Sequence, residues 1–515
     1  MSSATRLTAH ILPFALALWP GLALAEPLKV QLNADIRSNQ PGVNRDAGSD
    51  SVMMNVVEGL VTQGDGGRIV PALAESWTVS EDGTRYAFTL RDGVTFHNGE
   101  PLTADAVKWS LEKMLGDENF PCRNFFDGSR GAKITEIAAP DARTVTLTLE
   151  TPNALLLPLM AQTQCGGMGI VAQASYNADG SWKSPIGTGP FAFGAWKRGE
   201  SIQLIKYAGY VPHGDAPDGF GGRKEALVDE VNFLVVPDIS TAIAGLESGA
   251  LDILPYISPT EGAKLRDEKG LAITAEPHGG IVTMLFQTDD PLMSNLALRK
   301  AFVAALDMPG LVDAIMGGLT TPNNSLVASK SSYHGDVQKQ GYSYDPAAVP
   351  ALLAEAGYKG EKITILTNRR SAINFDTAMI AQAMLQAVGI NAEIEVLDWA
   401  TQLDRFNSGN YQVMAFNYSN RADPALAFQA VTGSKAENAN AIWDNDEVTA
   451  LVAQVTAEAD PAKRQALFDT LHQRFLAELP LVMLTNSLDV SAARPGIEGY
   501  RTLQGIVRLW GVSRS

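Results

Sequence analysis

Residues 59–115 constrain the fold of this chain more than any other stretch. Side chains in Arg85–Leu90 alternate between apolar and polar or small, which is the period of a strand with one buried face. The turn residues Glu81-Asp82-Gly83 come before this strand and favour a hairpin. Thr103 can cap a following helix that carries apolar residues on one side. The stretch therefore predicts a strand hairpin followed by a helix, and it contains nothing that looks catalytic.

Three segments carry ordered motifs that go beyond secondary structure. Residues 71–107 contain PALAESW and FHNGEPLTADAV, residues 185–196 read PIGTGPFAFGAW, and residues 299–307 read RKAFVAALD. Together they resemble the marker motifs of the periplasmic solute-binding proteins of the peptide, nickel and opine type, which serve ABC importers. The resemblance extends over nearly all of residues 27–515.

This resemblance implies an α/β fold with two lobes and a ligand cleft between them. Each lobe is expected to contain a mixed sheet flanked by helices, and an extra subdomain is inserted into the first lobe. The strands that alternate with helices after residue 291 are consistent with such a layered sheet. We expect a signal peptide at 1–25, a first lobe at 26–69, 184–283 and 488–515, an inserted subdomain at 70–183, and a second lobe at 284–487.

The N-terminus has the features of a secretory signal peptide. Residues 1–10 contain Arg6 and no acid, residues 11–18 are apolar, and Ala23-Leu24-Ala25 is a small-residue cleavage pattern. The apolar core is too short to span a bilayer. We therefore expect cleavage before Glu26 and a periplasmic protein. No cysteine for lipid attachment lies near the expected cleavage site.

The charge of the chain argues against some partners. Its 515 residues include 40 Lys and Arg against 57 Asp and Glu, a net charge of −17. An acidic protein is repelled by nucleic acid and by anionic membranes, so neither is an expected partner. The expected partners are a small-molecule ligand and the permease subunits at the inner membrane, and a monomer suffices for this role.

Cys122 and Cys165 are the two cysteines of the chain. In an exported protein an even pair favours a disulfide. Two buried thiols are the alternative. Catalytic use is not expected, because no cysteine-hydrolase signature surrounds either residue.

Two segments of the expected second lobe are candidates for ligand contact. Arg369 follows a strand directly, and in dipeptide-binding members an arginine near this position holds the ligand's carboxylate through two parallel hydrogen bonds. The segment AFNYSNRADP lies where those members carry an acid that receives the ligand's α-ammonium. Here the corresponding residue is Asn420, followed by Arg421. The missing acid weakens the case for a simple peptide, and the arginine suits a carboxylate, phosphate or sugar acid.

Further candidates come from the first loop and from nearby aromatic residues. The first strand-to-helix loop lies in the cleft of the resembled family, and aromatic rings of the second lobe can stack on a ligand. The alternatives are that the loop residues are solvated surface groups and that the aromatic rings pack in the core. The residues concerned are Arg37, Asn44 and Arg45 in the loop, and Trp399, Tyr418 and Trp443 among the aromatics.

The sequence therefore predicts the solute-binding component of an ABC importer, which captures a small anionic or polyhydroxylated solute such as an opine, glutathione or a sugar acid. A receptor for di- or oligopeptides is the nearest alternative, with a nickel receptor and a periplasmic chaperone as weaker ones. A secreted hydrolase is the alternative from another class, and the chain has neither a Gly-x-Ser-x-Gly nor a His-Glu-x-x-His motif. We expect no enzyme activity, no cofactor and no metal site.

Overall fold

The computed structural model describes residues 26–43, 47–129, 131–269, 271–421 and 423–515. The expected signal peptide at 1–25 and the candidate residues Asn44 and Arg45 lie outside these ranges. Within them, no helix is both long enough and apolar enough to cross a bilayer.

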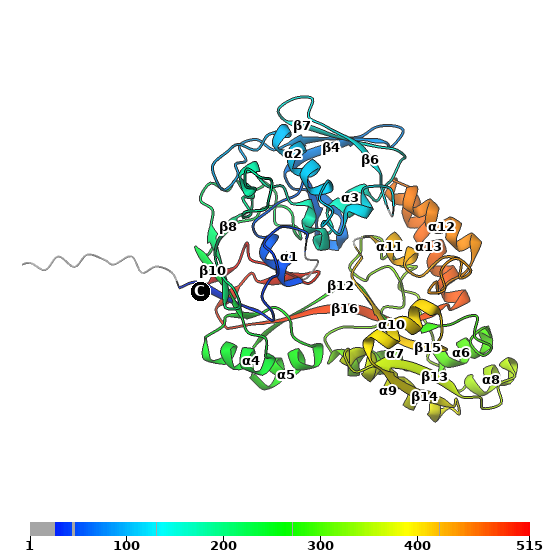
Figure 1. The fold of residues 1–515 in the computed structure, drawn as a ribbon. Helices are drawn as coiled ribbons and strands as arrows, with labels where there is room; N and C mark the ends of the chain where they lie inside the picture. Colours follow the sequence, from blue (N-terminus) through cyan, green and yellow to red (C-terminus); the bar gives the residue numbers. More distant parts are fainter. Residues whose placement is uncertain (1–25, 44–46, 130, 270, 422) are drawn as a thin grey trace, which may run out of the picture.

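A ten-stranded mixed sheet runs through the whole molecule (Figure 1). Its two longest strands, β12 (Ala272–Phe286) and β16 (Leu481–Ala493), pair antiparallel in the middle of the strand order. They pass from one half of the molecule to the other, so they connect the two lobes (Figure 1). Their ladder shifts register between Pro277 and Ile281, where residues 278–280 have no ladder partner on β16.

The remaining strands of the sheet divide between its two ends. On one side of the β12–β16 pair lie strands that precede residue 255, and on the other side lie strands between residues 363 and 418. Both ends combine parallel and antiparallel pairs. In sheet order the strands are β14 (Ala392–Leu397), β13 (Ile363–Asn368), β15 (Val413–Tyr418), β12, β16, β11 (Ile253–Leu254), β1 (Leu28–Leu32), β10 (Glu230–Val235), β9 (Ser201–Lys206) and β8 (Phe191–Lys197).

A separate four-stranded sheet forms the upper part of the molecule in Figure 1. Its order is β4 (Ala74–Val79), β5 (Arg85–Leu90), β7 (Thr144–Leu149) and β6 (Ile134–Ala138), and α2 (Ala104–Leu115) packs against it. The Thr103 hydroxyl caps α2 by accepting from the Ala106 amide at 3.2 Å. The strand and the capped helix expected between residues 85 and 115 are thus confirmed.

Helices cover the sheets of both lobes. Those of the first lobe are α1 (Ala47–Met53), α3 (Leu156–Met160), α4 (Ile239–Ser248) and α5 (Pro259–Lys269), with short 3₁₀ turns at Asp65–Gly67, Arg123–Phe125, Thr163–Met168 and Gln173–Ser175. Those of the second are α6 (Leu296–Ala304), α7 (Met308–Met316), α8 (Val349–Ala356), α9 (Ala372–Ala387), α10 (Trp399–Ser408), α11 (Pro424–Gln429), α12 (Asp446–Ala457) and α13 (Pro461–Glu478).

Short strands complete the first lobe. The hairpin of β2 (Val61–Gln63) and β3 (Ile69–Pro71) precedes the four-stranded sheet. After β16 the chain returns to the turn that follows α1, where the Asn55 side chain donates to the Val507 carbonyl at 3.0 Å and accepts from the Leu509 amide at 3.0 Å. The C-terminal strands are β17 (Ile497–Glu498), β18 (Arg501–Leu503), β19 (Ile506–Arg508) and β20 (Ser513–Arg514). The structure has the expected α/β architecture, while the residue boundaries assigned to the lobes stay a prediction.

Cys122 and Cys165 form a disulfide inside the upper subdomain. Their Cα atoms are 5.7 Å apart and both residues are fully buried. The bridge closes a loop between residues 43 positions apart and ties the segment after α2 to the turn at Thr163–Met168.

We expect the double variant Cys122→Ala/Cys165→Ala to lose about 2–4 kcal/mol of unfolding free energy, because the open loop gives the unfolded chain more freedom. Urea titration with and without a thiol reductant measures this. The reductant should lower the midpoint of the wild type and leave that of the double variant unchanged. Equal midpoints for all four samples would contradict a stabilising bridge.

Candidate functional site

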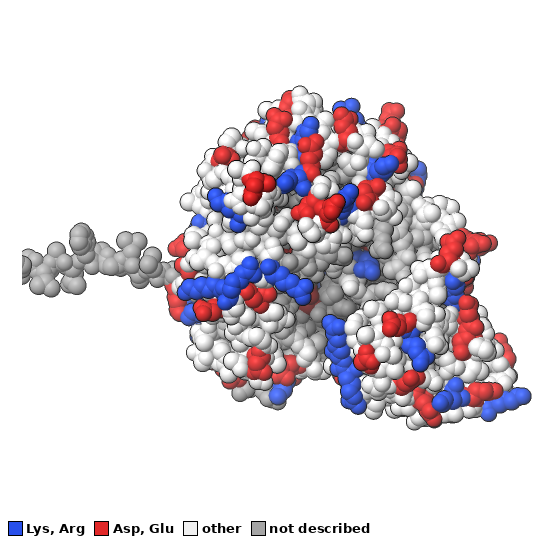
Figure 2. Space-filling view, viewed as in Figure 1, with Lys and Arg blue, Asp and Glu red and all other residues white. Residues whose placement is uncertain are grey.

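A cavity of about 340 Å³ lies between the two lobes, next to the point where β12 loses its register with β16. Figure 2 shows the hollow between the upper and the lower right parts of the molecule. Both lobes and the crossing strand β12 supply lining residues. A concave site of this size, closed from two sides, is typical of small-molecule binding. We call it the interlobe cavity.

The wall from the first lobe is built on the turn between β2 and β3. Asp218 holds this turn by accepting from the Asp65 amide at 2.7 Å and from the Arg68 guanidinium at 2.9 Å. Gly64 packs directly on the same carboxylate, and a Cβ there would approach its oxygens to 2.7 Å. Glycine is therefore needed where the turn meets Asp218.

Charges on this wall are already paired within the protein. Arg501, from β18, lies 3.4 Å from the Asp65 carboxylate and 3.6 Å from the Glu276 carboxylate. Glu276 belongs to the crossing strand β12. All three side chains line the cavity, and the two acids share one guanidinium. The shared guanidinium partly offsets the negative charge of this wall.

The floor of the cavity is the irregular part of β12. His278 accepts a hydrogen bond on Nδ1 from the Gly280 amide at 3.0 Å, and its Nε2 lies 3.7 Å from Asp489 Oδ1. Asp489 accepts from the Gly505 amide at 2.6 Å. Burial raises the pKa of Asp489 above its ordinary value, because a charged carboxylate is poorly solvated there. The floor thus joins the crossing strands to the C-terminal turn.

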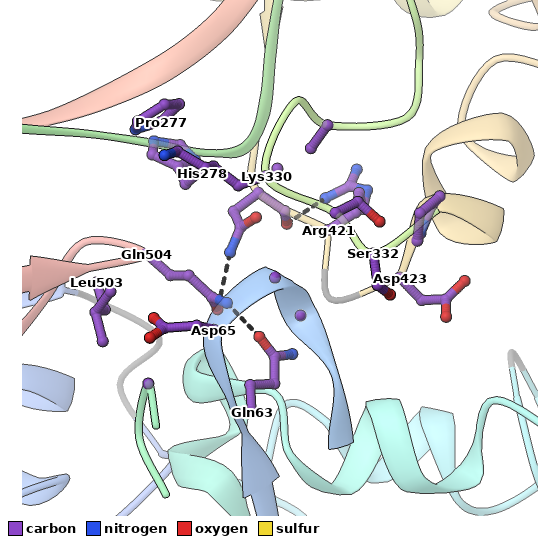
Figure 3. Close-up of a pocket in the computed structure, with 18 of the residues that line it drawn as sticks. Gln63, Asp65, Pro277, His278, Lys330, Ser332, Arg421, Asp423, Leu503 and Gln504 are labelled. Atoms are coloured by element: carbon purple, nitrogen blue, oxygen red, sulfur yellow. Dashed lines mark hydrogen bonds between the residues drawn. The ribbon is translucent and has the colours of Figure 1, made fainter. Parts of the chain in front are cut away.

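The wall from the second lobe follows β15 and is anchored by a buried ion pair. Asn420, Arg421 and Asp423 line the cavity from this segment. Asp423 receives two hydrogen bonds of 2.8 Å from the Arg464 guanidinium, and both side chains are 7% exposed. Asp423 also accepts from the Ala425 amide at 2.8 Å and caps α11. This carboxylate is therefore fully engaged in holding the wall, and Figure 3 shows it beside Ser332.

Of the residues expected from sequence, the structure brings Asn420 and Arg421 to the cavity. None of the other five described candidates lines it. Arg37 is exposed, and the Arg369 guanidinium lies 4.2 Å from the ring centre of Phe375. The remaining three, Trp399, Tyr418 and Trp443, pack among protein groups.

Packing explains where these aromatic residues lie. Trp399 stacks on Phe416 with ring centres 6.0 Å apart, and Tyr418 meets the same ring edge-on at 5.1 Å. Burial raises the pKa of the Tyr418 phenol. Trp443 is 3% exposed and donates from Nε1 to Glu478 at 2.7 Å. The packing alternative thus describes these three rings.

Sequence reasoning missed most of the cavity. Its lining comes from six separated parts of the chain, and no local motif links them. Two signals were present in the sequence: the turn Gly64-Asp65-Gly66-Gly67 and the pair Gly279-Gly280 inside an apolar strand. The missed lining residues include Gln63, Asp65, Glu276, His278, Lys330, Arg501 and Gln504.

Comparison of the chain with known proteins identifies the family to which it belongs. The model of the bacterial extracellular solute-binding proteins, family 5, matches residues 68–440, which is more than half of the chain. The chain belongs to this family. It is therefore the solute-binding component of an ABC importer, and the resemblance noted in the sequence is confirmed.

Individual relatives of this family 5 protein bind different solutes. Heme-binding protein A of Haemophilus influenzae is 27% identical over 92% of this chain and 88% of its own. The dipeptide-binding protein of Escherichia coli is 25% identical over 84% and 83%, and the glutathione-binding protein GsiB of Salmonella typhi is 26% identical over 94% of each chain.

Solved structures agree on the two-lobed fold. HbpA2 from Haemophilus parasuis superposes with a TM-score of 0.80 at 22% identity, covering 95% of this chain and all of that one. AgaA from Agrobacterium tumefaciens, solved with agropinic acid, gives 0.68 at 25% identity, covering 95% and 99%. Members of the family are periplasmic or extracellular.

The described residues contain no group of three or more His, Cys, Asp or Glu side chains arranged to hold a metal ion. The acids around the cavity are instead engaged by arginines, as in the pairs of Asp423 with Arg464 and of Asp65 with Arg501.

We expect Arg464→Met to cost about 3–5 kcal/mol of unfolding free energy, because it leaves the Asp423 carboxylate buried without its partner. Arg474→Met is the matched control. Arg474 also contacts two carboxylates, Glu447 and Glu478, but it is 35% exposed, so its loss should cost much less than that of Arg464. Chemical denaturation compares the two variants, and equal losses would contradict the anchoring role of the buried pair.

Proposed function

We propose that this family 5 protein captures a small solute with at least one anionic group in the interlobe cavity and delivers it to a membrane permease. The observation that carries the proposal is the distribution of charge around the cavity. Asp65, Glu276 and Asp423 each lie within 4 Å of an arginine. Lys330 and Arg421 add two further positive charges on the wall of the second lobe.

Arginine and lysine on one wall favour an oxyanion. A guanidinium can give a carboxylate or phosphate two parallel hydrogen bonds, and an ammonium adds a compact charge. Asn420, in the position where dipeptide receptors carry an acid, presents an amide, and its Nδ2 donates to Gln504 at 3.1 Å. An amide provides no negative charge for a ligand's ammonium. Opine-like, glutathione-like or sugar-acid solutes fit this wall.

The volume of the cavity supports the same class. About 340 Å³ lies at the low end of the range for ligand pockets, which runs from about 300 to 1,000 Å³. Amide and hydroxyl groups of Gln63, Ser331 and Ser332 line it beside the charges. They suit a polyhydroxylated or amide-bearing solute of modest size.

A di- or tripeptide receptor is the second candidate. Asp65 and Glu276 favour it, because either carboxylate could receive a peptide's ammonium group across the cavity from Arg421.

A receptor for either class of solute has to be exported to the periplasm. We infer that residues 1–25 are cleaved, that the protein works as a periplasmic monomer, and that the bound solute leaves unchanged.

The test is a binding screen of the mature protein against opines, glutathione, sugar acids and neutral and charged dipeptides. A solute at a hundred times its dissociation constant should raise the stability by about 2.7 kcal/mol, which a melting experiment detects. We expect Arg421→Ala to weaken binding of the best anionic solute by about ten- to a hundredfold in calorimetry, since hydrogen bonds to charged groups are worth about 1.5–3 kcal/mol.

Arg266→Ala is the control for a general change in charge. Arg266 lies on α5 and pairs with its neighbour Asp267, away from the cavity lining. It should leave the affinity unchanged. Binding confined to dipeptides with a free ammonium, and equal in Arg421→Ala and the wild type, would contradict the anionic-solute proposal and favour the second candidate.

A further inference from the structure

Three side-chain amides form a continuous hydrogen-bonded chain across the interlobe cavity. Asn420 donates from Nδ2 to Gln504 Oε1 at 3.1 Å, and Gln504 donates from Nε2 to Gln63 Oε1. All three residues line the cavity. Figure 3 shows Gln504 between Gln63 and the loop that carries Arg421. We call this chain the amide relay.

The relay connects parts of the protein that belong to different lobes. Asn420 follows β15, which pairs with β12 and β13 in the second lobe. Gln63 ends β2 in the first lobe. Gln504 lies in the turn between β18 and β19. The first lobe holds this hairpin, because the Asn55 side chain bonds to the backbone of Val507 and Leu509. The Asn420–Gln504 hydrogen bond is therefore a direct link across the cleft.

A second hydrogen bond crosses the cleft at another point of the cavity. The Ser332 amide donates to the Gly66 carbonyl at 3.0 Å. Gly66 lies in the turn after β2, and Ser332 lies in the loop of the second lobe that includes Lys330. Two turns of the first lobe that reach the cavity, at Gly66 and at Gln504, are thus each bonded to the second lobe.

The backbone at Gln504 indicates that its side chain is needed there. Gln504 and Gly505 are the two central residues of the hairpin between Leu503 and Ile506, with φ values of +53° and +76°. A hairpin turn of this kind favours Asn-Gly, because asparagine tolerates positive φ better than other side chains. Glutamine is the longer amide, and from this turn its side chain bonds to both Asn420 and Gln63.

We propose that the amide relay is a latch that holds the lobes closed in the absence of solute, with Gln504 as its central positioning residue. The relay crosses the cleft through a single neutral hydrogen bond, between Asn420 and Gln504, and the net contribution of such a bond is small. The latch is consequently weak and leaves both open and closed molecules populated, so a solute can enter and then shift the balance.

This proposal rests on the proposed solute site only for its location, and its test uses no solute. Distances between the lobes can be measured by double electron–electron resonance with spin labels at Val79→Cys on β4 and Met379→Cys on α9, two exposed positions in different lobes. The native cysteines are both in the disulfide, so the labels go to the new thiols.

The labelled protein should show a short-distance population in the absence of solute. Gln504→Ala should lower the ratio of closed to open molecules about two- to tenfold, the value of one neutral hydrogen bond. Gln504→Asn should do the same, although it suits the turn, because its amide is one methylene shorter. Gln340→Ala, which removes an exposed glutamine amide outside the cavity, should leave the ratio unchanged.

An unchanged ratio in Gln504→Ala, or a Gln504→Asn protein that closes as the wild type does, would overturn the latch. So would a wild type without any short-distance population. Loss of solute binding in Arg421→Ala does not enter this measurement, so the class of solute and the latch succeed or fail separately.

Discussion

The interruption in the ladder of β12 and β16 is the constraint on which the rest of the structure depends. These two strands carry the sheet from one lobe to the other, and their regular pairing stops between Pro277 and Ile281. The cavity opens at that point, lined by residues 276–279 of β12 and by a wall from each lobe. In a regular ladder residues 278–280 would pair with β16, and their backbone would not form the cavity floor. Because the ladder is interrupted there, the Gly280 amide donates to His278 Nδ1 and orients the imidazole ring.

The charged side chains around the cavity divide into those paired with each other in the walls and those that face the solute in the proposed function. The Arg464 guanidinium engages Asp423 from behind the wall, and Arg501 lies between Asp65 and Glu276. Arg464 offsets the charge of Asp423, while Arg501 offsets only part of the charge of Asp65 and Glu276. In the proposed function, Lys330 and Arg421 of the second lobe give the cavity its preference for an anionic solute. Relatives named for binding dipeptide, glutathione or heme share this family.

Much of the architecture could be predicted from sequence, because its signals are local. Thr103 caps a helix through its own side chain, and the residues of Arg85–Leu90 alternate by themselves. Asn420 and Arg421 could be placed because the Asp-Pro pair after them keeps the motif in register. The rest of the cavity depends on contacts between distant segments, such as Gln63 with Gln504, which no local pattern shows. Trp443 was a candidate for ligand contact, but its ring packs on Phe475 and its indole N–H donates to Glu478, 35 positions away.

The measurement that tests the central claim most directly is a crystal structure of the mature protein with the solute that stabilises it most. The account predicts the solute inside the interlobe cavity, with an anionic group against Arg421 and Lys330 and with both lobes in contact. Density for the solute outside this cavity, for example in the open depression of the second lobe beside Asp290 and Lys435, would contradict it.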